Sequence, residues 1–244
     1  MSSWWPCLAA KPGQKTQKVE TLISIIIPTF NAEDHLVRTL SSLVPGVVEG
    51  LIKEVVIVDG GSDDSTLEIA DSTGCQIVMA DADRGLQLWQ GCRAAKGDWL
   101  LIMHSNSQLG EGWMDSVQAH IKHFPLRAGY FHLRFDEPSL LVALWAEMLA
   151  LRARWLAMPS GDHGLLLSRA LYDSAGGYKD QVAFEDVALS MALGRARLRP
   201  MGASLTTSAA RFHAKGWAVG LLTKTMRFML YLLGFPPKPP IKKT

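Results

Sequence analysis

The sequence lacks several features that would assign it quickly to a class of protein. It has 3 cysteines in 244 residues (Cys7, Cys75 and Cys92), an odd number without the spacing of a metal site. This excludes a disulfide-rich secreted domain and favours a reduced compartment. Charge of one sign is lacking too, since 25 basic and 23 acidic residues leave a net charge of +2. That balance gives no general electrostatic reason to bind nucleic acid.

Long hydrophobic runs are also missing. The first twenty residues lack the pattern of a secretory signal, and no apolar stretch reaches the length of about 18 residues that a spanning helix needs. The nearest approach is Trp217 to Phe235, which Lys224 and Arg227 interrupt. On a helix this segment has a wide apolar face and a thin basic stripe. Two hypotheses stay open: a helix packed on the protein's own core, or an interfacial helix on anionic lipid at the inner face of the cytoplasmic membrane. Together with the cysteine content, we expect a cytoplasmic protein under either hypothesis.

Short apolar runs alternate with helical patterns in the first half of the chain. Buried strands are expected at residues 23–27, 55–59, 76–80 and 99–104, with helices after the first three. We expect Asn31 to cap the first helix, and Ser65 with Glu68 to form a capping box at the second. The alternation predicts βαβ units, and therefore an α/β fold with a mainly parallel central sheet flanked by helices.

The pattern changes to mixed helices and strands beyond Phe135, without a linker. We therefore predict one domain at residues 22–215, with a nucleotide-binding half at about 22–110 and an acceptor-binding half at about 111–215. A flexible extension at 1–21 precedes it. The amphipathic helix at 216–235 and a basic, proline-rich tail at 236–244 follow it.

Polar residues follow each of the four expected strands. They are Pro28 to Asn31, Asp59 to Asp64, Asp81 to Arg84, and His104 to Ser107. Because ligands of parallel α/β sheets bind beyond the carboxyl ends of the strands, four such turns in register favour one binding site over four ordinary loops. Asp59 can accept hydrogen bonds from a base or a ribose, Gly60 lets the backbone come close, and Arg84 can pair with phosphate.

These motifs carry a resemblance. The segments IPTFNAEDHLVRTLSSL and EVVIVDGGSDDST, an Arg-Gly turn and AAKGDWLLIMH resemble the opening half of the family 2 glycosyltransferases, which have the GT-A fold. In the second half, GDHGLLLSRALYDSAGGY, FEDVALS and TTSAARF are similar to a bacterial subgroup labelled arsenosugar-biosynthesis glycosyltransferases. The resemblance covers Leu22 to Gly234.

The resemblance implies a function. It implies an inverting transfer of a sugar from a nucleotide diphosphate, with UDP favoured, to a sugar, lipid-linked or small-molecule acceptor, as in polysaccharide biosynthesis. Asp186 would be the general base, and Glu185 would orient it or contact the acceptor. The residues implied for donor binding are Pro28, Thr29, Phe30, Asp59, Gly60, Arg84 and Arg211, and those for the acceptor side are Asp162 and His163.

The chain departs from this family at the metal position. The family's fourth strand ends in an aspartate-containing motif whose carboxylate holds Mg²⁺ or Mn²⁺, whereas this chain has Asn106 there, two residues after His104. An asparagine carbonyl can ligate a hard cation and His104 could assist, but neither side chain supplies a negative charge. Three alternatives stay open: weak metal binding, a metal-independent transfer in which Arg84, Arg211 or Lys215 replaces the cation, and a chain that binds the donor without catalysis.

Two other classes of function compete with the transferase. One is a non-catalytic relative that binds a nucleotide sugar or a partner enzyme; Asn106 favours it, and the intact Glu185-Asp186 pair argues against it. The other is a different nucleotide-using enzyme. Examples are a dinucleotide dehydrogenase and a nucleotidyltransferase. The lack of a G-x-G-x-x-G motif after the first expected strand disfavours the dehydrogenase, and the sequence has no P-loop. The oligomeric state stays open.

Overall fold

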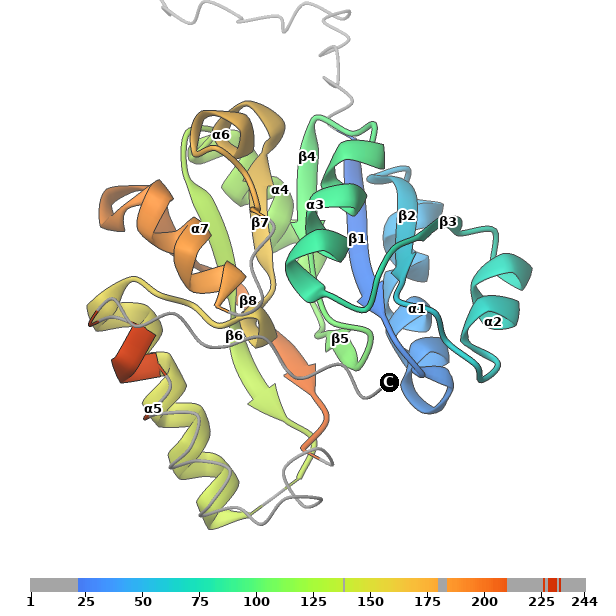
Figure 1. Ribbon diagram of the computed structural model, residues 1–244. Coiled ribbons are helices and arrows are strands. Elements are labelled where there is room, and N and C mark those ends of the chain that lie inside the picture. The colour runs from blue at the N-terminus through green and yellow to red at the C-terminus, as the bar shows by residue number, and fades with distance from the viewer. Residues whose placement is uncertain are drawn as a thin grey trace, which may run out of the picture.

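The computed structural model describes residues 22–137, 139–179, 184–209, 226, 228–231 and 233 (Figure 1). The predicted extension at 1–21, the tail at 236–244 and most of the helix predicted at 216–235 lie outside these residues. The hypothesis of membrane contact, which was drawn from that helix, therefore stays a prediction. Within the described residues, no helix combines the length and the apolar character needed to cross a membrane.

An eight-stranded sheet runs through the molecule in the order β3-β2-β1-β4-β7-β6-β8-β5. Its first part consists of parallel strands: β1 (Ile23–Thr29), β2 (Ile52–Asp59), β3 (Gln76–Met79) and β4 (Trp99–Ile102). Its second part is mixed, with β5 (Ser107–Leu109), β6 (Ala128–Phe135), β7 (Leu165–Ser168) and β8 (Leu198–Thr207). β7 is antiparallel to β4 and β6, while β8 is parallel to β6 and antiparallel to β5. The predicted α/β class with a mainly parallel sheet is confirmed.

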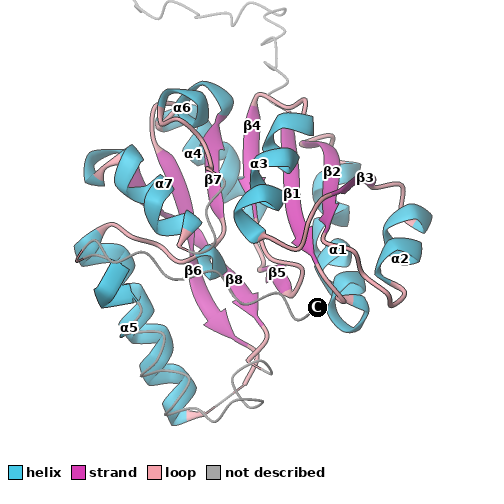
Figure 2. Cartoon of the chain, in the orientation of Figure 1, coloured by secondary structure: helices cyan, strands magenta, loops and turns pink. Residues whose placement is uncertain are grey.

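Helices cover both faces of the sheet (Figure 2). α1 (Glu33–Val48) and α4 (Trp113–His123) pack on one face, and α3 (Arg84–Ala94), α6 (Arg169–Ser174) and α7 (Glu185–Leu193) pack on the other. β1 shows why the strands are apolar throughout: Ile25 and Ile27 belong to the first core and Ile26 to the second, all fully buried. A strand covered on both sides must be apolar at consecutive positions.

The starts of helix α1 and helix α2 (Thr66–Ser72) are closed differently from the prediction. Ala32, not Asn31, is the N-cap of α1, so that prediction is wrong. Ser65 is the N-cap of α2, but its side chain makes no capping hydrogen bond, so the predicted capping box is not formed. Asp64 Oδ2 instead accepts from the Glu33 N–H, and Glu33 Oε2 accepts from the Ser65 N–H, each at 3.0 Å. Glu33 at the start of α1 and Asp64 just before α2 thus each accept from the start of the other helix, which ties the two helix starts together.

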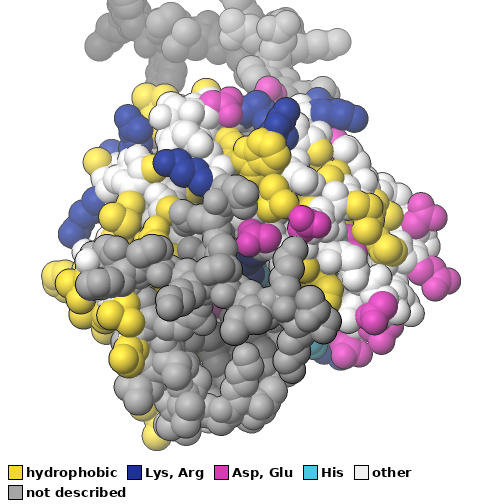
Figure 3. Space-filling model, viewed as in Figure 1, with side chains coloured by type: hydrophobic (Ala, Val, Ile, Leu, Met, Phe, Trp, Pro, Cys, Tyr) yellow, Lys and Arg dark blue, Asp and Glu magenta, His cyan; other side chains and the backbone are white. Residues whose placement is uncertain are grey.

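Helix α5 (Leu140–Leu156) lies apart from the other helices, against the end of β6 (Figure 1). Its buried side chains Val142, Trp145 and Leu149 contact Leu133 and Phe135 of β6. The opposite side of the helix is also apolar and exposed, with Leu140, Leu144, Met148, Leu151 and Trp155. Figure 3 shows hydrophobic side chains gathered along this edge of the molecule, over α5.

Two short 3₁₀ helices complete the described chain: η1 (Gly161–His163), which precedes β7, and η2 (Arg195–Arg197), which precedes β8.

Candidate functional site

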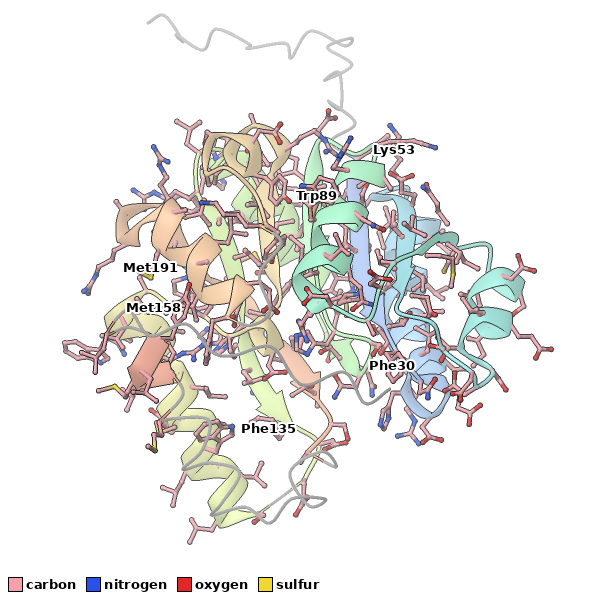
Figure 4. The ribbon with its side chains drawn as sticks, viewed as in Figure 1. Phe30, Lys53, Trp89, Phe135, Met158 and Met191 are labelled. Atoms are coloured by element: carbon pink, nitrogen blue, oxygen red, sulfur yellow. The ribbon has the colours of Figure 1, made fainter. Side chains whose placement is uncertain are left out.

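A cleft of about 240 Å³ opens beyond the carboxyl ends of β1 and β4. Its described lining is Pro28, Phe30, Asn31, Ala32, His35, Arg84, His104, Ser105, Asn106 and Ser208. The side chain of Phe30 lies at the end of β1 and is 57% exposed, so that a flat ligand can reach its ring (Figure 4). The structure thus brings together residues from three of the four turns that the sequence singled out.

Asp59, the last residue of β2, is fully buried and holds the loop that follows it. Its Oδ1 accepts from the hydroxyls of Thr29 (2.8 Å) and Ser62 (2.6 Å). Its Oδ2 accepts from the backbone N–H groups of Gly61 (2.9 Å) and Ser62 (2.7 Å). A carboxylate offers about four acceptor positions. The chain's own donors therefore satisfy this group, and a base or ribose would have to replace one of them.

Gly60 lies where two loops and a helix come close. Its N–H donates to the Thr29 carbonyl at 2.9 Å. A Cβ on this glycine would stand 3.0 Å from Gln87 Nε2 and 3.1 Å from the Ala82 backbone. The close approach predicted for this glycine is thus made to the protein's own chain.

Arg84, the first residue of α3, connects the two halves of the sequence. Its Nε lies 2.7 Å from Glu185 Oε1 on α7, and its Nη2 contacts His104 Nε2 at the end of β4. His104 Nδ1 in turn lies 3.0 Å from Asp162 Oδ1 in η1. A chain of four polar side chains therefore runs across the site, from the carboxylate of α7 to that of η1.

This geometry fixes the protonation of His104. A guanidinium has only donors, so His104 Nε2 must accept from Arg84. Nδ1 then carries the ring proton and donates it to Asp162. We assign this tautomer from the hydrogen-bond network, and it makes the imidazole neutral.

The carboxylates of Glu185 and Asp186 begin helix α7. Asp186 Oδ2 accepts from the Gly161 N–H at 2.8 Å, and Oδ1 accepts from the Val187 N–H at 2.9 Å. The helix start also favours negative charge there. Burial raises the pKa of Glu185; the Arg84 guanidinium opposes this, and the charge of Asp186 adds to it. Both predicted catalytic carboxylates are therefore held in defined positions, and Asp186 fixes the turn that bears Asp162.

Arg152 of α5 is a residue of this site that sequence reasoning missed. Its Nη2 lies 4.0 Å from Asp186 Oδ2, its Nε donates to the Met158 carbonyl at 2.9 Å, and its guanidinium stands 4.9 Å from the centre of the Phe228 ring. Burial lowers its pKa, and Asp186 opposes the shift. The available signal was a charged residue within an otherwise apolar helical pattern.

His163 is buried behind the same turn, with 1% of its surface exposed. Its Nδ1 accepts from the Ser160 N–H at 3.2 Å and lies 2.9 Å from the Ser160 hydroxyl. Burial is the main cause that lowers its pKa to about 4, and the nearby Arg152 adds to that effect. His163 is thus neutral at physiological pH, and it is not among the residues that line the cleft.

The residues predicted for a metal are only partly available. Asn106 lines the cleft, but its Oδ1 accepts from the Thr207 hydroxyl at 3.3 Å. His104 also lines the cleft and has both ring nitrogens engaged, as described above. In the part of the chain that the structure describes, no three His, Cys, Asp or Glu side chains are grouped so as to hold a metal ion. Arg211, predicted to contact the diphosphate, and Lys215 lie outside the described residues.

Comparison with known sequences identifies one family. Residues 24–138 match the family model described as Glycosyl transferase family 2. A glucosyl-3-phosphoglycerate synthase of Mycolicibacterium paratuberculosis is 26% identical over 110 residues, which are 39% of this chain and 33% of the relative. A PGL/p-HBAD biosynthesis glycosyltransferase of Mycobacterium bovis is 35% identical over 97 residues, which are 37% of each chain. The matched region thus spans about a third of the length of these curated relatives.

Solved structures resemble the whole fold. The crystal structure of S. aureus TarS 1-349 matches with a TM-score of 0.61 at 18% identity, over 76% of this chain and 60% of that chain. Glucosyl-3-phosphoglycerate synthase from Mycobacterium tuberculosis, in complex with Mn²⁺, UDP and glucosyl-3-phosphoglycerate, matches with a TM-score of 0.58 at 20% identity, over 89% of this chain and 82% of that chain. At these identities the likeness concerns the fold.

Proposed function

We propose that this chain, whose residues 24–138 match the Glycosyl transferase family 2 model, transfers a sugar from a nucleoside diphosphate donor to an acceptor hydroxyl. The observation that carries the proposal is the Arg84–Glu185 ion pair. It joins the cleft beyond β1 and β4 to the carboxylate pair of α7. A donor in the cleft would therefore lie beside a candidate base, as group transfer requires.

UDP is the favoured donor nucleotide. TarS has been crystallised in complex with UDP and with UDP-GlcNAc, and the mycobacterial synthase in complex with UDP. In this chain we assign base stacking to Phe30, whose exposed ring lines the cleft next to Pro28. Thr29 and Asp59 act mainly by holding the loop that forms the cleft wall.

We assign the role of general base to Asp186 and an inverting course to the reaction. The acceptor oxygen would attack the anomeric carbon while Asp186 takes its proton. The bond from that carbon to the diphosphate oxygen would break, and the nucleoside diphosphate would leave with the electron pair. The two backbone N–H groups that bind Asp186 fix its orientation, which is what general-base catalysis requires. Asp162 and His163 would belong to the acceptor side.

The test separates binding from catalysis. Asp186→Asn should bind UDP-glucose with unchanged affinity by calorimetry and release UDP about 100-fold more slowly or worse, because the proton acceptor is lost. Slow hydrolysis of the donor by water supplies the readout without a known acceptor. Asp115→Asn, an exposed carboxylate on α4, is the matched control. Unchanged turnover in Asp186→Asn would refute the assignment of the base.

A second candidate function is a non-catalytic donor-binding protein. Asn106 in place of a carboxylate favours it. This alternative predicts that the wild-type chain binds UDP-sugars but neither hydrolyses nor transfers them, whichever hydroxyl compound is supplied.

A further inference from the structure

We infer that the guanidinium of Arg84, and not a divalent cation, supplies the positive charge that faces the donor diphosphate in this chain. The inference rests on the proposed function, since it concerns the same cleft. It starts from the chemistry of the donor atoms at the end of β4 and from the contacts of Arg84.

The side chains at the end of β4 do not fit Mg²⁺ or Mn²⁺. These ions prefer at least one carboxylate oxygen, and Asn106 offers a neutral amide oxygen that already accepts from Thr207. His104 cannot replace the carboxylate, because its Nδ1 proton points to Asp162 and its Nε2 lone pair is taken by Arg84. A cation bound to His104 would have to displace a guanidinium of the same charge sign.

The side chain of Arg84 is held in a defined orientation by its neighbours. Glu185 binds its Nε and His104 contacts its Nη2, so the planar group is oriented from two sides. Within the described chain Nη1 has no such partner, and Arg84 lines the cleft with 37% of its side chain exposed. A guanidinium is charged at every physiological pH, and its remaining N–H groups suit two phosphate oxygens.

The glycine of the η1 turn is part of the same arrangement. A Cβ at Gly161 would lie 2.7 Å from His104 Nε2 and 3.0 Å from Arg84 Nη2. The turn therefore packs directly against the point where the two side chains meet. A side chain at this position would have to push the imidazole of His104 or the guanidinium of Arg84 aside.

The experiment is calorimetric titration of the full chain with UDP, once with excess EDTA and once with millimolar MnCl₂. The two affinities should agree within about threefold. Arg84→Gln should weaken UDP binding about tenfold or more in EDTA, and Arg84→Lys should recover part of the loss because it keeps the charge but not the planar fork. Arg93→Gln, an exposed arginine of the same helix, is the control and should bind UDP as the wild type does. Melting curves of each variant confirm folding.

A second arm restores the missing carboxylate. Asn106→Asp should gain Mn²⁺ binding, seen in the electron paramagnetic resonance spectrum of the ion, together with stronger UDP binding in Mn²⁺. The wild type should show neither. UDP binding by the wild type that strengthens sharply with Mn²⁺ would overturn the inference and leave the proposed function standing. No binding of UDP, GDP or their sugar conjugates under either condition would overturn the proposed function itself.

Discussion

Several residues of this site use their polar groups to hold neighbouring loops in place. Asp59 is the clearest case, because its buried carboxylate collects two hydroxyls and two backbone N–H groups from two loops. Asn31, with φ of 48°, adds to the same construction: it exchanges two hydrogen bonds with Asp63, at 2.7 and 3.0 Å. The shape of the cleft thus depends on hydrogen bonds between the protein's own loops.

Replacing Asp59 should reveal this structural role. Asp59→Asn keeps the shape and one acceptor oxygen, while the hydroxyls of Thr29 and Ser62 can turn to accept from the new amide. We expect a loss of about 1–3 kcal/mol in the free energy of unfolding, and a larger loss for Asp59→Ala, which leaves buried donors unpaired. Urea denaturation measures both, with the exposed Asp81→Asn as control. Wild-type stability in Asp59→Ala would contradict the role.

His163 should make stability depend on pH. Its pKa is about 4 in the folded protein and about 6.5 in the unfolded chain, so the unfolded state binds the proton more readily between these values. Stability should therefore be unaffected above about pH 6.5 and fall as the pH drops toward 4, by up to about 3 kcal/mol from this residue alone.

The matched variant is His163→Asn, whose oxygen can still accept from the Ser160 N–H but does not titrate. Urea denaturation at pH 7 and pH 4.5 should show a smaller drop for His163→Asn than for the wild type. The exposed His123→Asn should behave as the wild type. Equal drops in all three proteins would show that His163 is not the buried titrating group.

At the scale of elements, α5 carries apolar side chains on both of its sides. Leu149 is 5% exposed and packs on β6, whereas the preceding residue, Met148, lies on the outer side and is 39% exposed. Its hydrophobicity therefore does not tell from the sequence which side faces the core.

Two neighbouring truncations test the orientation of α5. Leu149→Ala should cost about 2–5 kcal/mol of unfolding free energy because it opens a cavity against β6. Met148→Ala should change the stability by no more than about 0.5 kcal/mol. Chemical denaturation of the two variants decides the point, and a larger cost for Met148→Ala would mean that the helix is rotated or covered.

Some of the elements and contacts could be predicted from the sequence, and others could not. β1, β2 and β4 were predictable because strands buried on both faces are apolar at consecutive positions. The caps of α1 and α2 were not, since Glu33 and Asp64 act on each other across 31 positions of sequence. Arg152 and the Arg84–Glu185 pair depend in the same way on distant segments that folding brings together. Motifs thus identified candidate site residues, but they did not identify the side chains that these residues contact in the folded protein.

At the scale of the whole molecule, one continuous sheet carries both halves of the site. β4 connects them, because it pairs with β1 on one side and with β7 on the other. Two side-chain contacts cross the same boundary: Arg84 with Glu185, and His104 with Asp162. The proposed donor and acceptor sides therefore share one framework, and these two contacts connect them.

A double-mutant cycle measures that coupling. Arg84→Gln leaves the largely buried Glu185 carboxylate without its cation, which should cost about 1–3 kcal/mol of unfolding free energy. Adding Glu185→Gln removes the stranded charge, so the double variant should be more stable than Arg84→Gln alone. Denaturant unfolding of the four proteins gives the coupling, and strictly additive effects would show that the two side chains act independently.

The Arg84–Glu185 pair also affects which anions would compete for the cleft in a cell. A lone guanidinium at a cleft mouth would attract chloride, inorganic phosphate and every small metabolite that carries a phosphate. Here Glu185 competes with each of them from inside the fold, at a distance of 2.7 Å. A weakly held anion gains little against such a neighbour, whereas a nucleotide also contributes its base and ribose. If Arg84 faces the diphosphate as inferred above, the pair would disfavour abundant small anions and leave the cleft available for a nucleotide.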